Sequence, residues 1–367
     1  MSFNGRLLMA NIVILGAGVM GSALSVPAAA GNSVTLVGSP LDDAIISEVR
    51  ETGRHPGLNV DLPQSIQVST ASEQNTAAFE NADVIVIGVS SPGVDWALVE
   101  IARYRAKPDV LALVTKGLVS GAGAAPQTYA QYIDPQLTST AGRIVGIGGP
   151  CIARELALGI PTRVSFAALQ LSAANDLRDL LQTEYYRVTT STDITALEAC
   201  AALKNFMCIG VSAMYTAYAT EEGHAKNPLA ALFNQAVLEI DLLSRWIVSG
   251  VAKPDVDDSD EFSQSNRTLS AFDLPGMGDL HVTVGGGRNS RLGKYLGSGR
   301  RLQQVQRNEM HGVTVEGVDT GRQLSAGFQA ACENGELDAH VLPLTAAILA
   351  CIDQDLPFKF DFSSLPG

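Results

Sequence analysis

The stretch at residues 11–21 reads NIVILGAGVMG, an apolar run that leads directly into the pattern G-x-G-x-x-G. The apolar residues 12–15 predict a buried strand, and the residues after Gly21 predict a helix. In such a unit Gly16 makes a tight turn, Gly18 lets the backbone approach a pyrophosphate, and Gly21 lets the helix pack close to the strand. The stretch therefore predicts a dinucleotide site made by Gly16, Gly18, Val19, Met20 and Gly21.

Strand and helix patterns alternate along the first half of the chain. Continuous apolar strands separated by helices are typical of a parallel sheet that is covered on both faces. After Asp193 the sequence changes to long stretches rich in Ala, Leu and Met, with few strand signals. We therefore expect an α/β fold: a Rossmann-type doubly wound parallel sheet in residues 1–192, followed by an all-helical domain in residues 193–367. The expected strands lie at 12–15, 34–37, 84–89, 110–114, 144–147, 163–167 and 186–190.

Composition limits the classes of partner. The 367 residues are 46% apolar and 17% charged, with a net charge of -13, and a field of that sign repels nucleic acid and anionic membranes. No uninterrupted apolar run reaches the roughly 20 residues of a membrane-spanning helix. The five cysteines show no C-x-x-C spacing, so we expect neither a zinc site nor disulfides, as in a cytoplasmic protein. The acidic segment 253–262 is expected to be a solvated loop.

The choice between NAD and NADP stays open. An acidic residue about 20 positions beyond the glycine pattern commonly binds the ribose hydroxyls of NAD. Here the second strand ends in Val37-Gly38-Ser39-Pro40, which is neutral, so NADP is at least tolerated. Arg50 and Arg54 lie downstream and are candidates for a 2'-phosphate, although solvated surface arginines are the commoner explanation.

Ligands of open parallel sheets bind beyond the carboxyl ends of the strands. Ser90, Lys116 and Gly149 follow three of the expected strands. A lysine at one strand end and a glycine-proline turn at another suit an anionic substrate, although an ordinary surface lysine is the alternative for Lys116.

A lysine and an asparagine, Lys204 and Asn205, lie among Ala, Leu, Phe and Met in the first long helix of the second half. Charged residues in such surroundings are seldom buried without a function. Reduction of a ketone by hydride transfer leaves an alkoxide, and a partly desolvated lysine can supply the proton that this oxygen needs. Lys204 is therefore the candidate acid–base group, and the alternative is a lysine that extends to the helix surface.

A glycine-rich segment carries a third group of candidates. Asp279 and Thr283 precede the sequence Gly-Gly-Gly-Arg-Asn, which ends at Asn289. Gly287 would let the backbone approach a ligand, and Arg288 with Asn289 suits phosphate oxygens. Asp279 could pair with Lys204, or it could be a helix cap. No acidic residue occurs from 280 to 308, so this segment is a basic region in an acidic chain, with further cations at Arg291, Lys294, Arg300, Arg301 and Arg307. A flexible basic surface loop is the alternative interpretation.

Seven motifs occur in one order along the chain: GAGVMG at 16–21, TKG at 115–117, GGPCIARE at 148–155, ALKN at 202–205, GMGDL at 276–280, GRN at 287–289 and VEG at 315–317. Together they resemble the NAD(P)-dependent glycerol-3-phosphate dehydrogenases, and GSALSVP at 21–27 with RHP at 54–56 resembles the archaeal-type branch most. Two positions depart from the family pattern: Cys151 stands where a Ser or Thr is usual, and Gln235 where an arginine is usual.

The resemblance implies the interconversion of dihydroxyacetone phosphate and sn-glycerol 3-phosphate with NAD or NADP. It also implies an active site in a cleft between the two domains, and a homodimer. Lys204 would be the proton donor and acceptor. The remaining roles that it implies are substrate contacts by Lys116, Gly149, Asp279, Arg288 and Asn289, a position near the cofactor for Ala153, Arg288 and Glu316, and support of the site by Asn205 and Thr283.

Two other functions fit the same sequence. One is a related dehydrogenase that acts on another phosphorylated polyol or a small hydroxy acid, as ketopantoate reductases do. The phosphate-suited Gly287-Arg288-Asn289 argues against a plain acid as the substrate. The other is a catalytically silent dinucleotide sensor, against which the presence of both Lys204 and Asp279 argues.

Overall fold

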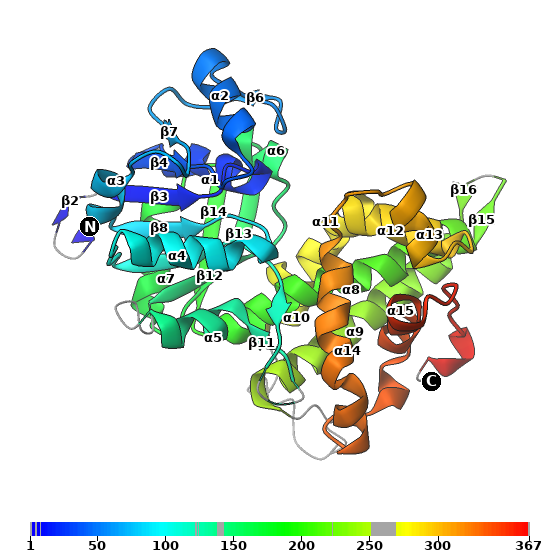
Figure 1. Cartoon of the computed structure of the whole chain (residues 1–367). Coiled ribbons are helices and arrows are strands. Elements are labelled where there is room, and N and C mark those ends of the chain that lie inside the picture. The colour runs from blue at the N-terminus through cyan, green and yellow to red at the C-terminus, as the bar shows by residue number, and fades with distance from the viewer. Residues whose placement is uncertain are drawn as a thin grey trace. The chain divides into compact units, whose positions relative to one another are not determined.

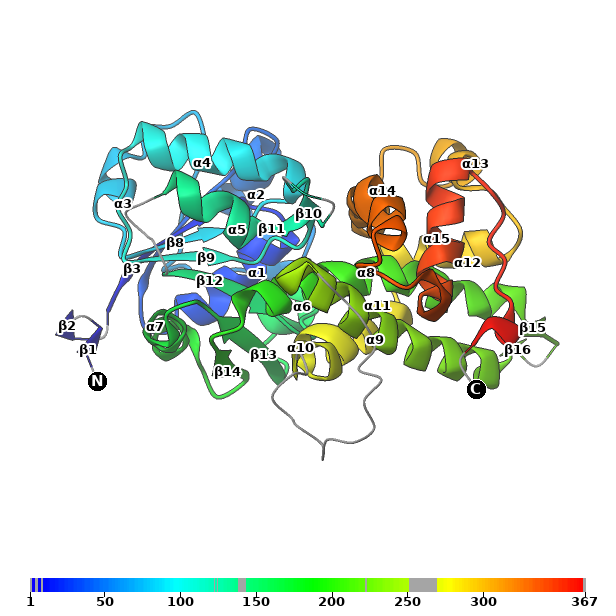
Figure 2. The same ribbon diagram turned by 90° about the horizontal axis from the view of Figure 1, so that it is seen from below.

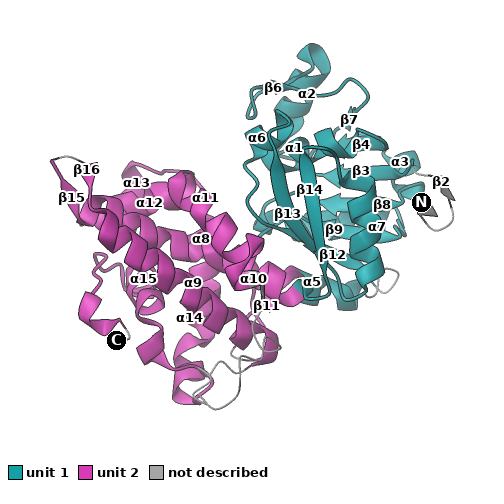
Figure 3. Cartoon of the chain, turned by 180° about the vertical axis from the view of Figure 1, so that it is seen from behind, with its two compact units in different colours: residues 1–116, 130–194 teal, residues 117–129, 195–367 magenta. Residues whose placement is uncertain are grey.

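Two compact units make up the chain (Figures 1 and 3). Unit 1 comprises Met1–Lys116 and Ala130–Ile194, and unit 2 comprises Gly117–Tyr129 and Thr195–Gly367. The acidic segment 253–262, which we expected to be a loop, lies outside the described residues. The computed structural model describes residues 2–3, 6–7, 9–121, 123, 125–137, 143–221, 223–250 and 269–365.

Unit 1 is built on an eight-stranded sheet with the order β14-β13-β12-β9-β8-β3-β4-β7. Neighbouring strands are parallel except β12 and β13, which pair antiparallel. The Rossmann-type sheet is thereby confirmed, although the apolar strand patterns indicated neither the antiparallel pair nor the short edge strand β7. The strands are β3 (Asn11–Leu15), β4 (Ser33–Val37), β7 (Gln67–Ser69), β8 (Val84–Ile87), β9 (Val110–Leu113), β12 (Ile144–Gly148), β13 (Thr162–Ala167) and β14 (Tyr186–Ser191).

Helices cover both faces of this sheet, with α1 and α7 on one face and α4 and α5 on the other (Figure 2). The strand order reverses between β3 and β8, which is where a doubly wound sheet opens a crevice for a ligand. Helix α1 ends one residue after Pro27, because a proline removes a backbone hydrogen bond from the helix. The helices of unit 1 are α1 (Val19–Ala28), α2 (Asp43–Thr52), α3 (Thr76–Glu80), α4 (Val94–Arg103), α5 (Tyr129–Ile133), α6 (Ala153–Ala157) and α7 (Leu171–Leu181).

Helix α8 (Ile194–Ala217) forms the core of unit 2 (Figure 1). Every residue from 196 to 214 is buried. By length and composition α8 could cross a membrane, but 94% of its apolar window is buried inside the protein, as expected for a core helix. Around it lie α9 (Lys226–Ser249), α10 (Leu269–Phe272), α11 (Asp279–Gly285), α12 (Arg288–Gly297), α13 (Leu302–Asn308), α14 (Glu316–Glu333) and α15 (Pro343–Gln354).

Three glycines let α12 and α14 approach the backbone of α8 directly. A Cβ atom at Gly293 or Gly297 of α12 would collide with the carbonyl oxygen of Ile209 or Ala213. On α14, a Cβ atom at Gly317 would likewise collide with a carbonyl oxygen of α8. Residues four apart share one face of a helix, so Gly293 and Gly297 form one contact surface of α12 without side chains.

Unit 2 also contains short strands, in contrast to the all-helical domain expected. One hairpin, β10 (Leu118–Val119) with β11 (Gln127–Thr128), comes from the first half of the chain. Leu118 is buried in the core of unit 2, and the Ser120 hydroxyl donates to Gln323 Oε1 of α14 at 2.9 Å. The chain therefore enters unit 2 before residue 192, where the sequence analysis placed the end of the first domain. A second hairpin pairs β15 (Ala219–Thr220) with β16 (Gly223–His224).

A buried carboxylate joins α9 to the N-terminus of α15. The two oxygens of Glu239 accept hydrogen bonds from the backbone amides of Leu344 and Thr345 at 2.8 and 2.6 Å, from the Thr345 hydroxyl and from the Gln235 amide. These four bonds lower the pKa of Glu239, but burial raises it by more, to about 7. Burial therefore outweighs the hydrogen bonds, and Glu239 takes up a proton more readily in the folded chain.

Because the folded chain holds this proton more tightly than the unfolded chain, the carboxyl group contributes most to stability below its ordinary pKa of about 4.5. That contribution is lost as the pH rises toward 7. We predict that the free energy of unfolding falls between pH 5 and pH 8 by about 2 kcal/mol more in the wild type than in Glu239→Gln. Denaturant titrations at both pH values measure the difference. Glu333→Gln, an exposed position on α14, controls for the loss of one carboxylate, and equal pH dependences of wild type and Glu239→Gln would contradict the prediction.

Candidate active site

Lys204 lies in the middle of α8, where its side chain is only 6% exposed. Its Nζ atom donates to Asp279 Oδ1 at 2.9 Å and to Thr283 Oγ1 at 2.7 Å. The alternative of a lysine extending to the surface is therefore excluded, and the pairing with Asp279 suggested by the sequence is present. A buried ammonium next to a buried carboxylate has its charge compensated, whereas either group alone would be costly.

A local distortion of the chain positions the two partners of Lys204. The segment Leu274–Gly278 forms a turn of π-helix that continues into α11 at Asp279, and the Asp273 side chain accepts a hydrogen bond from the Leu274 amide at its start. Such turns are frequent at functional sites. Thr283 lies one helical turn after Asp279 and donates its hydroxyl proton to the Asp279 carbonyl oxygen at 2.6 Å. The Thr283 oxygen is thereby oriented to accept a hydrogen bond from the lysine.

A ring of hydrogen bonds next to Lys204 connects α8, α12 and α14. The Asn205 amide donates to Glu316 Oε2 and accepts from the Asn289 amide, both at 2.9 Å. Arg288 donates to the other Glu316 oxygen at 3.1 Å, and the Gly317 backbone amide donates to Asn289 Oδ1 at 2.9 Å. Since 288 and 289 are adjacent, as are 316 and 317, the bonds close on themselves. The ring fixes the Arg288 guanidinium relative to the helix that carries Lys204.

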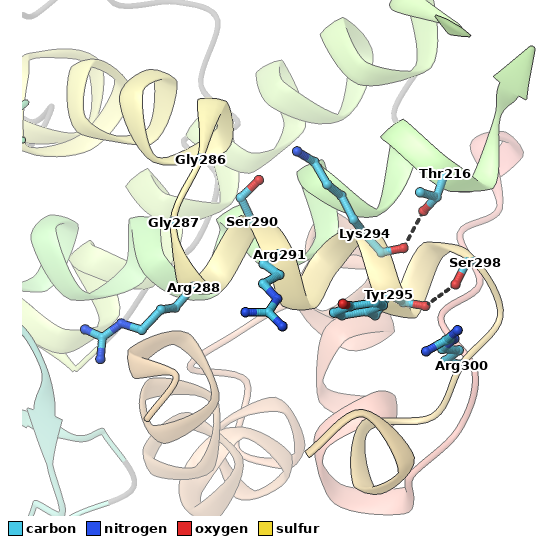
Figure 4. A pocket seen from close by; sticks show the side chains of 10 residues that line it. All are labelled: Thr216, Gly286, Gly287, Arg288, Ser290, Arg291, Lys294, Tyr295, Ser298 and Arg300. Atoms are coloured by element: carbon cyan, nitrogen blue, oxygen red, sulfur yellow. Dashed lines mark hydrogen bonds between the residues drawn. The ribbon is translucent and has the colours of Figure 1, made fainter. Parts of the chain in front are cut away.

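The start of α12 is open. Gly285, Gly286 and Gly287 are exposed, and a Cβ atom on any of them would meet nothing within 4 Å. Arg288 follows directly and is 54% exposed (Figure 4). Backbone amides and a guanidinium at a helix start are suited to a phosphate group. Unit 2 thus brings together Lys204, Asn205, Asp279, Thr283, Arg288, Asn289 and Glu316.

Unit 1 holds the glycine pattern, in the position between β3 and α1 that the sequence predicts. Gly16 has φ +109°, and a Cβ atom there would lie 2.8 Å from Val89. A Cβ atom on Gly21 would collide with the Gly16 carbonyl oxygen, so this glycine lets α1 pack against the turn. Around Gly18, by contrast, a Cβ atom would meet nothing within 4 Å, which leaves room for a pyrophosphate at the start of α1. The next two residues are exposed Val19 and half-buried Met20.

Ser90, Lys116 and Gly149 follow β8, β9 and β12. These strands are neighbours and parallel, so the three residues lie at the same edge of the sheet as Gly16. Ala153 begins α6. Lys116 belongs to unit 1 and is therefore not among the residues that unit 2 gathers around Lys204.

Sequence reasoning missed two side chains that hold the glycine-rich turn. Asp42 Oδ2 accepts from the backbone amides of Ala17 at 3.0 Å and Ser39 at 2.8 Å. Buried His55 donates from Nε2 to the Ala17 carbonyl oxygen at 2.9 Å, and its Nδ1 accepts from the Leu58 amide at 3.1 Å. The backbone amide and carbonyl of Ala17 are thus both hydrogen-bonded, by residues 25 and 38 positions further along the chain. No local pattern reveals such contacts.

Comparison with known proteins gives consistent matches along the chain. Residues 11–174 match the family described as NAD-dependent glycerol-3-phosphate dehydrogenase N-terminus, and residues 193–360 match its C-terminus. The chain is 33% identical to the NADP(+)-dependent glycerol-3-phosphate dehydrogenase of Archaeoglobus fulgidus, over 84% of this chain and 87% of that protein. It is 30% identical to the glycerol-3-phosphate dehydrogenase [NAD(P)+] of Symbiobacterium thermophilum, over 95% and 91%. Its fold matches the crystal structure of glycerol-3-phosphate dehydrogenase from Coxiella burnetii with a TM-score of 0.72 at 24% identity, covering 96% and 97%.

The contacts of Asp42 yield a test of the glycine-rich turn. We predict that Asp42→Ala weakens binding of the reduced dinucleotide about tenfold, because hydrogen bonds to a charged group contribute about 1.5–3 kcal/mol and their loss frees the Ala17 amide. Titration followed by nicotinamide fluorescence measures the affinity. The matched control is Asp43→Ala, which removes an exposed carboxylate one residue away. Equal affinities for the two variants would show that Asp42 does not hold the turn.

Proposed function

The chain belongs to the family of NAD-dependent glycerol-3-phosphate dehydrogenases, and we propose that Lys204 is the acid–base group of its reaction. The reaction is reversible hydride transfer between NAD(P)H and dihydroxyacetone phosphate, which gives sn-glycerol 3-phosphate. The observation that carries the proposal is the buried Lys204 ammonium, held by Asp279 and Thr283. A proton donor must be fixed in position and in its protonated form when the substrate oxygen is reduced.

In the direction of reduction, the Lys204 ammonium gives one proton to the carbonyl oxygen as the carbon accepts the hydride. In the reverse direction, the neutral amine takes that proton from the hydroxyl group. Asp279 compensates the charge of the ammonium form, and the Thr283 hydroxyl fixes its direction. Asn205 does not contact Lys204 in the bonds described above and instead supports Arg288 and Asn289 through the ring.

The substrate phosphate would bind at the open start of α12, with Gly287, Arg288 and Asn289 as its ligands. The exposed glycines leave the approach free, and the guanidinium offers a planar pair of donors. Glu316 accepts hydrogen bonds from both Arg288 and Asn205. The proposed phosphate ligand Arg288 is thereby connected to α8. Lys116 and Gly149 of unit 1 are proposed as further substrate contacts on the basis of the family resemblance.

The dinucleotide, NAD or NADP, supplies or accepts the hydride. Its pyrophosphate would lie against Gly16, Gly18 and the first residues of α1, where the space around Gly18 fits the group. Ser90 lies at the same sheet edge, whereas Ala153, Arg288 and Glu316 are proposed cofactor neighbours by resemblance alone.

We further propose a soluble, cytoplasmic homodimer with neither nucleic-acid nor membrane partners. All five cysteines lie in the described part of the chain and are free thiols, which fits a reducing compartment. The net charge of -13 opposes binding to nucleic acid. The homodimer is proposed from the family resemblance alone.

We predict that Lys204→Ala lowers kcat for dihydroxyacetone phosphate reduction by about two to four orders of magnitude, the usual contribution of a positioned acid–base group. Binding of the reduced dinucleotide should persist, because its proposed ligands are mainly in unit 1. Oxidation of NADH or NADPH followed by absorbance measures turnover, and circular dichroism checks folding. Lys226→Ala, an exposed lysine at the start of α9, is the control. Near-normal turnover of Lys204→Ala would remove this residue from the mechanism.

Arg288→Ala should raise the KM for dihydroxyacetone phosphate about tenfold to a hundredfold, because a charge-assisted pair of hydrogen bonds to phosphate contributes about 1.5–3 kcal/mol. The kcat should change less. The matched control is Arg322→Ala, since Arg322 is 55% exposed and pairs with a carboxylate of the same helix α14, as Arg288 does. Unchanged kinetics in Arg288→Ala would show that this residue does not contact the substrate anion.

A further inference from the structure

A second feature of the basic region lies along α12, beyond the residues that the proposed reaction uses. Unit 2 has a pocket of about 730 Å³ whose charged lining residues are Arg288, Arg291, Lys294 and Arg300 (Figure 4). Glycines, hydroxyl side chains and Tyr295 complete the lining, and no carboxylate is part of it. In a chain with a net charge of -13, such a concentration of cations marks a place where anions are attracted.

These cations are held in place by their neighbours. Arg291 donates to the Glu309 carbonyl oxygen at 2.6 Å, and its guanidinium lies 5.8 Å from the centre of the Tyr295 ring. The guanidinium of Arg300 lies 5.3 Å from the same ring and pairs with the Glu309 carboxylate. Lys294 Nζ lies 4.7 Å from the Tyr215 ring. Side chains that are already ordered lose less conformational entropy when a ligand binds.

The charges of Arg291 and Lys294 are not neutralised by ion pairs within the part of the chain that the structure describes. By contrast, Arg288 pairs with Glu316 and Arg300 with Glu309. Arg291 and Lys294 therefore provide the excess positive charge of the pocket, and an anion is the ligand that would balance it.

The pocket is larger than the proposed substrate phosphate site. Arg288 begins α12 and Ser298 caps its end, so the lining extends about 15 Å along the helix at 1.5 Å per residue. Lys294 points to one side of α12, whereas Arg288 and Arg291 point to the other (Figure 4). A single phosphate is too small to contact cations so widely separated. A pocket of this volume is in the range that accommodates a ligand of nucleotide size.

We propose that this pocket is a second anion-binding site for a soluble small molecule that carries two or more linked phosphate groups. Arg291 and Arg300, which lie beside the same tyrosine ring, would be its ligands, and Lys294 on the other side of α12 would add to the positive charge that attracts it. The site goes beyond the proposed dehydrogenase function, because none of these three side chains takes part in the acid–base group or its ring. Arg288 lies at one end of the pocket and is the residue that the two sites share.

Inorganic pyrophosphate is the probe for this site. The full chain is first saturated with NADH and sn-glycerol 3-phosphate, which occupy the proposed cofactor and substrate sites and cannot react with each other. Isothermal calorimetry should then show one pyrophosphate bound per chain, and ADP should compete for it. Sodium sulfate at matched ionic strength controls for screening of charge.

The double variant Arg291→Gln/Lys294→Gln should weaken pyrophosphate binding at least tenfold while kcat and KM stay unchanged. Its matched control, Arg307→Gln/Arg322→Gln, removes two exposed arginines that do not line the pocket and should bind as the wild type does. The proposal would be overturned if pyrophosphate did not bind, or if it bound the two double variants with equal affinity. It would also be overturned if sulfate gave the same binding heat as pyrophosphate. Pyrophosphate binding seen only without sn-glycerol 3-phosphate would also overturn it, since the pocket would then be part of the substrate site.

Discussion

The close approach of α12 and α14 to the backbone of α8 is the constraint on which the architecture of unit 2 depends. Gly293 and Gly297 remove the side chains that would hold α12 away, and Gly317 does the same for α14. Long side chains at these positions would separate the helices by the width of a methyl group or more. The hydrogen bonds of the ring are about 3 Å long, so they exist only because the helices touch.

Packing and polarity support each other in this region. The buried groups Lys204, Asp279, Asn205 and Asn289 would be costly in an apolar core if they were unpaired. Each is paired with a group on another helix, and the helix contacts exclude water from most of the bonds. Only Arg288 and part of Glu316 reach solvent. The arrangement therefore presents one exposed cation, Arg288, that hydrogen bonds connect to the helix of the buried Lys204.

Much of this could be predicted from the sequence, because the deciding signals are local. The glycine pattern after an apolar strand predicts the turn between β3 and α1, and the strand ends place Ser90, Lys116 and Gly149 at one edge. The apolar residues around Lys204 marked this lysine as a candidate, and pairing with it was one of two interpretations of Asp279. In each case a few neighbouring residues carry the information.

Other features depend on contacts between distant segments and had no local signal. Asp42 and His55 form hydrogen bonds with the backbone of Ala17 only once the chain has folded, since neither residue shares a motif with Ala17. The antiparallel position of β13 depends on how the chain returns to the sheet, and an apolar strand pattern is the same for both directions. The roles of the helix-packing glycines likewise become visible only when the neighbouring helix is in place.

The hairpin of β10 and β11 has a consequence for how the chain is divided. Because the chain leaves unit 1 for this hairpin and returns at the start of α5, it crosses between the two units three times, near residues 116, 129 and 194. A fragment ending at residue 192 would keep the hairpin but lose α14, leaving Leu118 and Ser120 without the surfaces that they contact. Unit 1 is therefore not one continuous segment of the chain. A fragment that contains unit 1 alone would have to lack the hairpin as well as everything after residue 194.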